Sequence, residues 1–225
     1  MDRFFTKAFE NMPEEAKESF LKTLFMQDDS DYATALRLEY YKSKLGFMGE
    51  NVKIGKNVKL VNPQYIRLGD RVQIGDGATL IARGEGGITL GEGTRLQERV
   101  YLDTERTDTG YIHIGKRVYI GTGTTLFGHA GLEIGDYSLL AQNITLTPYS
   151  HKFDDPEKRI YLQGGHMEKV TIGTDVYIGM GVCILYSGSI GDGSVVGAGA
   201  VVAKPIPPYS VAVGNPAVVI RKRGG

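Results

Sequence analysis

His151 is the residue of this sequence best placed for acid–base chemistry. It lies near the start of a polar, proline-containing stretch, Pro148 to Lys169, which interrupts a six-residue pattern that resumes at Ile172. A repeat that stacks identical coils has no structural need to eject about twenty residues, so we expect this loop to carry function. An imidazole changes its charge near neutral pH and can take the proton of a hydroxyl group as the oxygen attacks an electrophile. The sequence therefore places one candidate general base in a loop that interrupts the repeat.

Four further polar residues around this loop are candidates for binding a substrate: His129, Asn143, Asp154 and Asp155. His129 lies in a shorter break of the pattern and is either a site residue or a corner histidine bonded to the backbone. Asp154 and Asp155 follow His151 closely enough to bind acceptor hydroxyls or to orient loop groups, with solvated loop carboxylates as the alternative. Asn143 lies inside a coil, where it either contacts a ligand or joins a ladder of stacked asparagines.

The histidines do not have the spacing of a zinc site. They are His113, His129, His151 and His166, separated by 16, 22 and 15 residues. A zinc carbonic anhydrase built on the same repeat would gather three histidines around one metal, two of them close in sequence. We therefore expect no metal requirement and keep that enzyme as a minor alternative.

Composition excludes several classes of protein. The 225 residues include 26 basic and 26 acidic side chains, so there is no overall basic field to bind nucleic acid or anionic lipid. A single cysteine, Cys183, excludes an intrachain disulfide and any multi-cysteine metal site. No apolar run is long enough to span a membrane, and the first thirty residues lack the apolar core of a signal peptide. A cytoplasmic location is expected.

A period of six begins near Val52, with an aliphatic residue leading each hexad and a glycine often following it. A period of six fits neither a helix of 3.6 residues per turn nor an alternating strand. Two inward residues in each hexad, separated by a glycine-rich corner, are typical of a parallel β-helix in which each leader stacks on the leader one coil earlier. Three hexads to a coil give about seven coils. The clearest leaders are Ile54, Leu60, Leu68, Ile74, Leu90, Leu96, Ile114, Ile120, Ile134, Leu140, Ile172, Ile178, Ile184, Ile190, Val196 and Val202.

The sequence divides into three parts. Residues 1–49 are poor in glycine and rich in charged and aromatic side chains, and we expect helices there. One helix follows Pro13, and a second is capped by Asp29-Ser30-Asp31, with Tyr32, Leu36 and Tyr40 along one stripe. Residues 50–203 form the β-helix with its loop at about 148–169. Residues 204–225 form a C-terminal capping tail. Shorter breaks of the pattern at 82–89 and 103–112 are interpreted as tolerated corner insertions.

Two segments give the sequence a family resemblance. VTIGTDVYIGMGVCILYSGSIGDGSVVGAGAVVAKPIPPYSVAVGNPAVVIRKR, residues 170–223, is similar to the C-terminal signature of the hexapeptide-repeat acyltransferases, which include the maltose and galactoside O-acetyltransferases. IGDYSLLAQNITLTPYSHKFDD, residues 134–155, resembles the segment of that family in which a hexad ends, a loop begins and a catalytic histidine follows. The resemblance covers about residues 52–223, since long-range hexad register, loop position and the GNPA tail coincide.

The resemblance implies a left-handed parallel β-helix and a homotrimer whose active sites lie between subunits, with acetyl-CoA as co-substrate. It places His151 on the family's catalytic histidine. Tyr177 stands where the family usually has tryptophan in a V-W-I-G motif. Five more residues fall on positions that line CoA: Met180, Ala198, Ala203, Lys204 and Arg221. The two cations have a physical reason to be there, because CoA carries several phosphate charges.

The sequence also departs from the family. Val218 occupies a position where the family has an arginine, which leaves the 3′-phosphate of CoA to Arg221, Lys222 or Arg223. On the acceptor side, Gly123 aligns with a sugar-contacting asparagine of the galactoside enzyme, and the acidic pair that follows there aligns with the stretch around His129. A different acceptor is therefore expected.

The leading hypothesis is an O-acetyltransferase that moves acetyl from acetyl-CoA to a hydroxyl of a saccharide or its precursor. The nearest alternative is N-acetylation of an amino sugar, free or nucleotide-linked, because the same histidine could deprotonate an amine. A non-catalytic scaffold of the same repeat is a further alternative. Neither nucleic acid nor a membrane is expected as a partner.

Overall fold

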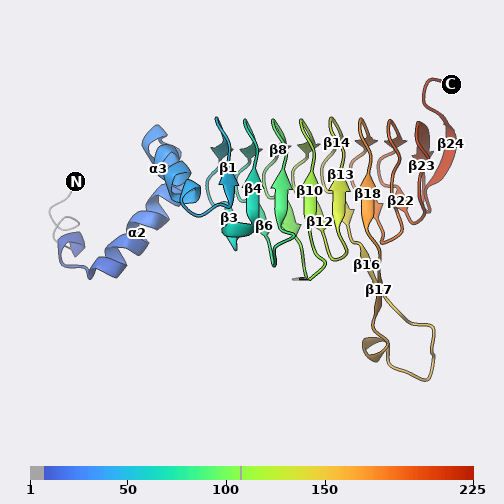
Figure 1. Cartoon of the computed structure of the whole chain (residues 1–225), viewed down its shortest axis with the longest axis horizontal. Helices are drawn as coiled ribbons and strands as arrows, with labels where there is room; N and C mark the ends of the chain where they lie inside the picture. Colours follow the sequence, from blue (N-terminus) through green and yellow to red (C-terminus); the bar gives the residue numbers. More distant parts are fainter. Residues whose placement is uncertain (1–7, 107) are drawn as a thin grey trace.

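The computed structural model describes residues 8–106 and 108–225, and residues 1–7 of the expected helical segment lie outside that description. A straight stack of coils forms most of the chain, with two helices at one end and a long hairpin projecting from the side (Figure 1). The parallel β-helix predicted from the hexads is confirmed. Within the described residues, no helix is both long and apolar enough to cross a membrane.

Each coil contributes one short strand to each of three parallel sheets. The first sheet contains β1 (Phe47–Met48), β4 (Ile66–Leu68), β7 (Ile88–Leu90), β10 (Ile112–Ile114), β13 (Leu132–Ile134) and β18 (Val170–Ile172). The second contains β2 (Lys53–Ile54), β5 (Gln73–Ile74), β8 (Arg95–Leu96), β11 (Tyr119–Ile120), β14 (Leu139–Leu140), β19 (Tyr177–Ile178), β21 (Val195–Val196), β23 (Ser210–Val213) and β24 (Val218–Lys222). The third contains β3 (Lys59–Val61), β6 (Thr79–Ile81), β9 (Tyr101–Asp103), β12 (Thr125–Phe127), β15 (Thr145–Leu146), β20 (Cys183–Ile184) and β22 (Val201–Val202).

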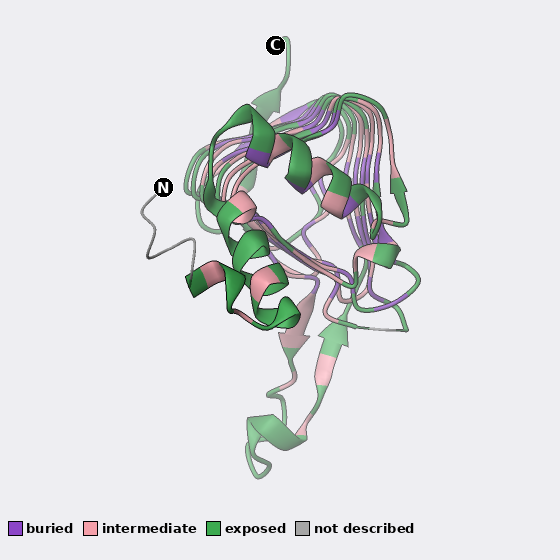
Figure 2. Cartoon of the chain, turned by 90° about the vertical axis from the view of Figure 1, so that its left-hand side faces the viewer, coloured by how far each residue is buried: buried purple, intermediate pink, exposed green. Residues whose placement is uncertain are grey.

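The hexad leaders form the core. Every predicted leader is buried except Leu60, which is half-buried near the helical end. Leaders stack in register from coil to coil, as Ile120 does on Leu96 and Leu140. Buried residues therefore line the inside of the coils along their whole length (Figure 2). Burial of an aliphatic side chain contributes about 1.5–3 kcal/mol, so the stacked columns supply most of the stability of the solenoid.

Hydroxyl groups replace aliphatic side chains at several inward corner positions without leaving polar atoms unpaired. Thr94 donates to Gly115 O at 2.7 Å and accepts from Val118 N at 3.2 Å. Ser138 donates to Gly173 O at 2.8 Å and accepts from Val176 N at 3.1 Å. Each hydroxyl ties its corner to the next coil, because buried polar groups are stable only when they are hydrogen-bonded.

Both predicted N-terminal helices are present, as α2 (Glu14–Gln27) and α3 (Asp31–Lys42), and Ser30 caps α3 through Ala33 N. Figure 2 shows α3 lying across the end of the coils, while α2 projects from them and buries no residue. The packed face of α3 consists of Ala33, Arg37 and Tyr41. The predicted stripe of Tyr32, Leu36 and Tyr40 is wrong by one position, because Arg37 packs inward: its guanidinium donates to Phe25 O at 2.6 Å and to Asp28 O at 2.5 Å.

The C-terminal tail closes the other end of the solenoid. After the last hexads, β23 continues the second sheet parallel to β21, and β24 folds back antiparallel to β23. This antiparallel strand ends the repeat, and its five residues are exposed.

Insertions occur at one corner of the solenoid. We call the segments that connect the third sheet to the first the insertion corner: 62–65, 82–87, 104–111, 128–131, 147–169 and 185–189. The other two corners keep a constant four residues, as in 69–72 and 75–78. The breaks at 82–89 and 103–112 therefore lie on the same edge as the long loop, stacked beneath it.

Candidate active site

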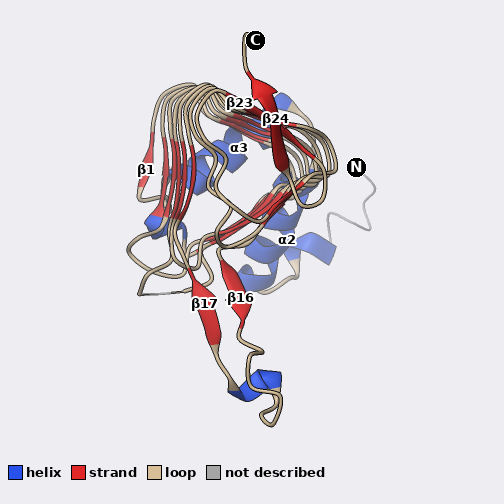
Figure 3. Cartoon of the chain, turned by 90° about the vertical axis from the view of Figure 1, so that its right-hand side faces the viewer, coloured by secondary structure: helices blue, strands red, loops and turns tan. Residues whose placement is uncertain are grey.

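His151 lies on an antiparallel hairpin that leaves the insertion corner. Strand β16 (Tyr149–His151) pairs with β17 (Gly165–Met167), and His151 lies opposite Gly165. Figures 1 and 3 show this hairpin pointing away from the coils, with a short 3-10 turn (Ile160–Leu162) near its tip. The paired strands hold an otherwise irregular loop in one direction and leave His151 exposed to solvent.

Tyr149 contacts the catalytic candidate directly. Its hydroxyl oxygen lies 3.2 Å from His151 Nδ1, and the two rings are perpendicular with centroids 4.9 Å apart. Residues two apart in a strand point to the same face, which brings the two side chains together. When Nδ1 carries the proton and donates to the Tyr149 hydroxyl, the lone pair of Nε2 remains free to accept a proton. Sequence analysis missed Tyr149, although the alternation in Tyr149-Ser150-His151 was a usable signal.

Gly165 makes room for this contact. A Cβ atom at Gly165 would lie 2.4 Å from the ring of Tyr149 and 2.5 Å from its hydroxyl oxygen. Such distances are far below van der Waals contact, so the ring of Tyr149 can lie across the neighbouring strand only because residue 165 has no side chain.

His129 stacks on the ring of Tyr149. Their rings are nearly parallel, at 17°, with centroids 5.3 Å apart, and Phe127 packs edge-on against His129 at 5.8 Å. Burial lowers the pKa of His129, partly opposed by the negative charges of Glu105 and Asp103. His129 Nδ1 is buried without a hydrogen-bond partner in the described structure. Burial therefore favours the neutral form of the His129 imidazole, since a charged ring would have to be desolvated.

A buried carboxylate supports the corner one coil further down. Asp103 accepts hydrogen bonds from Arg83 at 2.7 and 2.8 Å, from the Tyr101 hydroxyl at 3.1 Å and from Glu105 N at 2.8 Å. Burial acts to raise the pKa of Asp103, but these hydrogen bonds and the charge of Arg83 outweigh it and lower the pKa. The Tyr101 ring in turn packs edge-on against Phe127 at 6.0 Å. A continuous row of aromatic rings thus connects this ion pair to His151.

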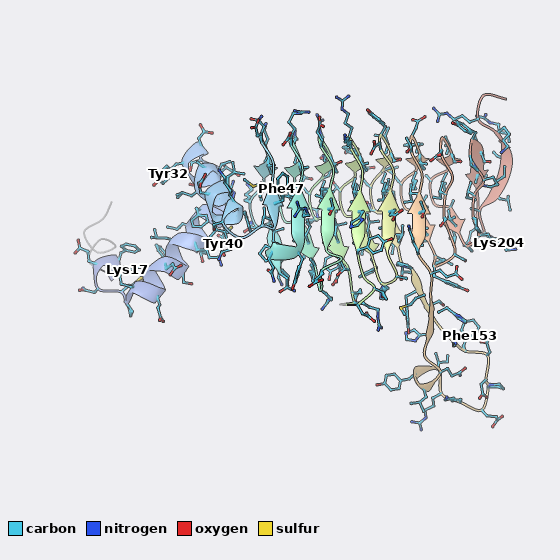
Figure 4. All side chains as sticks on the ribbon, viewed as in Figure 1. Lys17, Tyr32, Tyr40, Phe47, Phe153 and Lys204 are labelled. Atoms are coloured by element: carbon cyan, nitrogen blue, oxygen red, sulfur yellow. The ribbon has the colours of Figure 1, made fainter. Side chains whose placement is uncertain are left out.

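The candidate CoA residues lie on the C-terminal coils. Tyr177 faces outward from the second sheet, and Met180 and Ala198 occupy the corner that follows it. Ala203 and Lys204 follow β22, on the connection from the third sheet to Ile206, and Figure 4 shows Lys204 at the C-terminal end of the solenoid, with Phe153 on the projecting loop. Arg221 lies on β24.

The chain is similar to known proteins in sequence and in fold. Residues 169–204 match the family model described as the hexapeptide repeat of succinyl-transferase. A probable acetyltransferase of Mycobacterium tuberculosis is 34% identical over 177 residues, which cover 79% of this chain and 50% of the relative. The chain contains the hexapeptide repeat and is similar to acetyltransferases that share it.

Other acyltransferases are also similar. The galactoside O-acetyltransferase of Escherichia coli is 44% identical over 91 residues, covering 40% of this chain and 43% of the relative. The crystal structure of the polySia-specific acetyltransferase NeuO shares 26% identity at a TM-score of 0.60, over 79% of this chain and 76% of that one. The match to the N-acyltransferase AntD from Bacillus cereus, at 23% identity and a TM-score of 0.59, covers 83% of this chain and 88% of that one, so the two share the fold. The chain spans about half the length, or less, of the curated relatives it matches.

The hexapeptide-repeat fold separates some residues that the sequence suggested together. Asn143 lies on the four-residue corner after the second sheet, where its coil is followed by those of Met180 and Ala198. Backbone hydrogen bonds connect these coils there, from Gly181 N to Gln142 O and from Gly199 N to Met180 O. Within one chain, Asn143 therefore lies on the corner that carries CoA candidates and away from the insertion corner that carries His151.

The two loop carboxylates differ in their contacts. Asp155 accepts from Glu157 N at 3.0 Å, and its backbone exchanges hydrogen bonds with the Gln163 amide at 3.1 and 2.9 Å, so it shapes the tip of the hairpin. Asp154 is exposed. The structure brings neither carboxylate into hydrogen-bond contact with His151.

The remaining histidines lie elsewhere. His113 faces outward from the first sheet with its ring 4.6 Å from that of Tyr111, and His166 stacks on Tyr186 at 6.1 Å. No group of three or more His, Cys, Asp or Glu side chains in the described parts of the chain could hold a metal ion.

Proposed function

We propose that this protein transfers the acetyl group of acetyl-CoA to a hydroxyl of a saccharide acceptor, with His151 as general base. The contact that carries the proposal is the one between Tyr149 and His151, which fixes an exposed imidazole at the insertion corner of an acyltransferase fold. Two relatives support the choice of acceptor, a galactoside O-acetyltransferase and a polySia-specific acetyltransferase.

The proposed chemistry is a direct transfer. His151 Nε2 accepts the acceptor's hydroxyl proton while the oxygen attacks the thioester carbonyl carbon. The carbon–sulfur bond then breaks, and the protonated His151 returns the proton to the departing thiolate. Tyr149 accepts a hydrogen bond from Nδ1 throughout, which stabilises the positive charge that the ring carries between the two proton transfers.

The direct test is release of free thiol from acetyl-CoA in the presence of free sugars, nucleotide sugars and oligosaccharides. Base-labile acetylation of a hydroxylated acceptor is the expected result. A base-stable product formed only from amino sugars would assign N-acylation instead, because amides resist mild base. No thiol release with any acceptor would favour a non-catalytic scaffold.

We expect the active species to be a homotrimer with active sites between subunits. The hairpin tip exposes four large apolar side chains that one chain leaves uncovered: Phe153, Ile160, Tyr161 and Leu162. Tyr177 and Met180 are also exposed on the coils. Contiguous apolar surface of this kind marks a contact with another molecule. Sedimentation velocity at assay concentrations should give a trimer or a dimer of trimers, whereas a fully active monomer would contradict the expectation.

Lys204→Ala and Arg221→Ala should each raise the KM for acetyl-CoA more than they lower kcat. Contacts to remote phosphates stabilise the ground state and the transition state alike, and loss of one charged hydrogen bond corresponds to about 1.5–3 kcal/mol, roughly a tenfold to hundredfold change. Lys204 is exposed, and Arg221 donates to two backbone carbonyls, Lys222 O and Gly225 O, at 3.0 Å each. Lys59→Ala, at an exposed lysine on the third sheet, is the matched control. Unchanged KM in both variants would place the phosphates elsewhere.

Arg223 and Lys222 make different contacts. Arg223 pairs with Asp175 at 2.8 Å, and Lys222 donates to Pro208 O at 3.0 Å. Both side chains hold the tail against the coils. Of the three basic residues, we therefore propose Arg221 for the 3′-phosphate.

A further inference from the structure

The outward-facing residues of the second sheet form one row along the axis of the solenoid, and the row changes character halfway. Strand register aligns each residue with its successor one coil on. In order, the row contains Lys53, Gln73, Arg95, Tyr119, Leu139 and Tyr177. The half near the helices is cationic and polar. The other half is aromatic and aliphatic and ends at Tyr177, one of the candidate CoA residues.

A groove of about 670 Å³ lies along this row from Lys53 to Leu139. Its lining includes four cations, Lys53, Arg71, Arg95 and Arg117, and contains no carboxylate. The chain as a whole has no net charge. Arg71 is paired with Glu92, so the local positive potential that favours an anionic ligand comes mainly from Lys53, Arg95 and Arg117.

The corner beside the row contributes two of the cations. Arg71, Gly93 and Arg117 occupy equivalent positions on successive coils, linked by backbone bonds from Gly93 N to Asp70 O and from Arg117 N to Glu92 O. Gly93 has φ +70° and no side chain, and a Cβ atom there would lie 3.4 Å from Cγ of Arg117, so the stem of Arg117 runs beside the backbone of the preceding coil. Arg71 pairs with Glu92, and the Arg117 guanidinium lies 6.0 Å from the ring of Tyr137.

We propose that this groove binds an acidic oligosaccharide, a chain of sugars that carries carboxylates along its length, as the acceptor. Neighbouring coils lie about 4.8 Å apart, so Lys53 and Arg95, two coils apart, are separated by about 10 Å along the axis, as are Arg71 and Arg117. The repeated charges of such a chain can pair with cations on several coils. The two phosphoryl groups of a nucleotide diphosphate share one oxygen and would reach the cations of only one coil. Tyr119 and Leu139 continue the groove with the apolar surface on which sugar rings stack.

The inference rests on the proposed function, because a bound acceptor would extend from the cations toward Tyr177, one of the residues proposed to contact CoA. Binding can be measured without acyl donor, so the two proposals fail separately. Thiol release with a neutral sugar and no binding of acidic oligomers would overturn only the groove. Binding of acidic oligomers without thiol release under any condition would overturn only the transferase.

The experiment compares the binding of tetragalacturonate and of neutral maltotetraose by titration calorimetry, with UDP-N-acetylglucosamine as the diphosphate probe. The groove variant is Arg95→Gln/Arg117→Asn. Its control, Arg67→Gln/Arg99→Asn, is matched position by position: Arg67 faces outward from β4 in the first sheet, and Arg99, like Arg117, has positive φ at a corner, 54° against 53°. Asparagine is chosen at these corners because it tolerates positive φ. Sedimentation velocity checks that each variant keeps its assembly.

Tetragalacturonate should bind the wild type and the control alike, and the groove variant at least about fivefold more weakly, since exposed charge pairs contribute modestly. The difference should shrink as salt rises, because screening shortens the reach of these charges. Equal affinity in the groove and control variants would overturn the proposal, as would equal binding of maltotetraose. Tighter binding of UDP-N-acetylglucosamine that depends on the same two arginines would assign the groove to a diphosphate and overturn the acidic oligosaccharide.

Discussion

His151→Ala should lower kcat by roughly 10²- to 10⁴-fold while leaving assembly and the affinity for acetyl-CoA unchanged, since that is the usual contribution of a positioned general base. The imidazole is exposed on the hairpin and contributes nothing to the stacked aliphatic columns, so the fold should tolerate its loss. Steady-state kinetics with sedimentation of the same sample measures both outcomes. Near-normal turnover in His151→Gln or His151→Asn would remove His151 as the base, because an amide replaces a hydrogen bond but accepts no proton.

Removal of the Tyr149 hydroxyl should lower the rate less than removal of the His151 imidazole. Tyr149→Phe keeps the ring between His129 and Gly165 but removes the partner of His151 Nδ1. The rate should fall by much less than in His151→Ala, with the KM for acetyl-CoA unchanged.

The pH profile distinguishes the two histidines. A general base must be unprotonated, so kcat/KM falls on the acid side of the profile, and this limb should vanish in His151→Ala. Burial lowers the pKa of His129, so a limb governed by His129 would lie at lower pH than that of an ordinary histidine and would survive the substitution.

Arg83→Met should destabilise the fold by about 3 kcal/mol, because it leaves the fully buried carboxylate of Asp103 without its ion pair. The remaining bonds from Tyr101 and Glu105 N, and the partial exposure of Arg83, place the effect at the lower end for a broken buried pair. Denaturant unfolding at fixed protein concentration measures it. Arg106→Met breaks an exposed pair with Asp108 on the same insertion and should change stability by less than about 1 kcal/mol. Equal effects would show that Arg83 acts through packing and not through charge.

The pH dependence of this effect has a definite sign. Hydrogen bonds and charge lower the pKa of folded Asp103 below its unfolded value, so the stabilisation is present above the unfolded pKa, about 3.9, and is lost as pH falls through the folded pKa. The difference between wild type and Arg83→Met should therefore narrow as pH falls through the lowered pKa of folded Asp103, because the carboxyl group becomes neutral there.

The repeat was predictable because each coil repeats a local rule. An aliphatic leader every six residues, followed by a small or β-branched residue four positions on, specified the core, and only Leu60 departed from the expected burial. Helix positions were predictable for the same reason, from Pro13 and the Ser30 cap. The inward face of α3 was not, since a stripe search favours apolar residues and Arg37 is buried by backbone carbonyls up to 17 residues away.

The surroundings of His151 could not be derived from local pattern. His129 and Tyr149 are twenty residues apart, and Tyr101 and Phe127 are twenty-six apart, so their contacts depend on which corner absorbs each insertion. The break at 103–112 was interpreted as a tolerated insertion, yet its buried Asp103 supports the row of rings. The need for glycine at position 165 follows from the pairing of the two hairpin strands, which brings residue 165 against the ring of Tyr149.

The insertion corner accommodates connections of very different length. Strands on both sides stay in register whether the connection is 62–65 or 147–169, and the entropy of closing a loop grows only slowly with its length. The segment 147–169 can thus be exchanged as a unit: a chimera that carries a relative's loop between β15 and β18 should unfold at nearly the same denaturant concentration. The surroundings of His151 can therefore change in length and sequence while the stacked coils keep their stability.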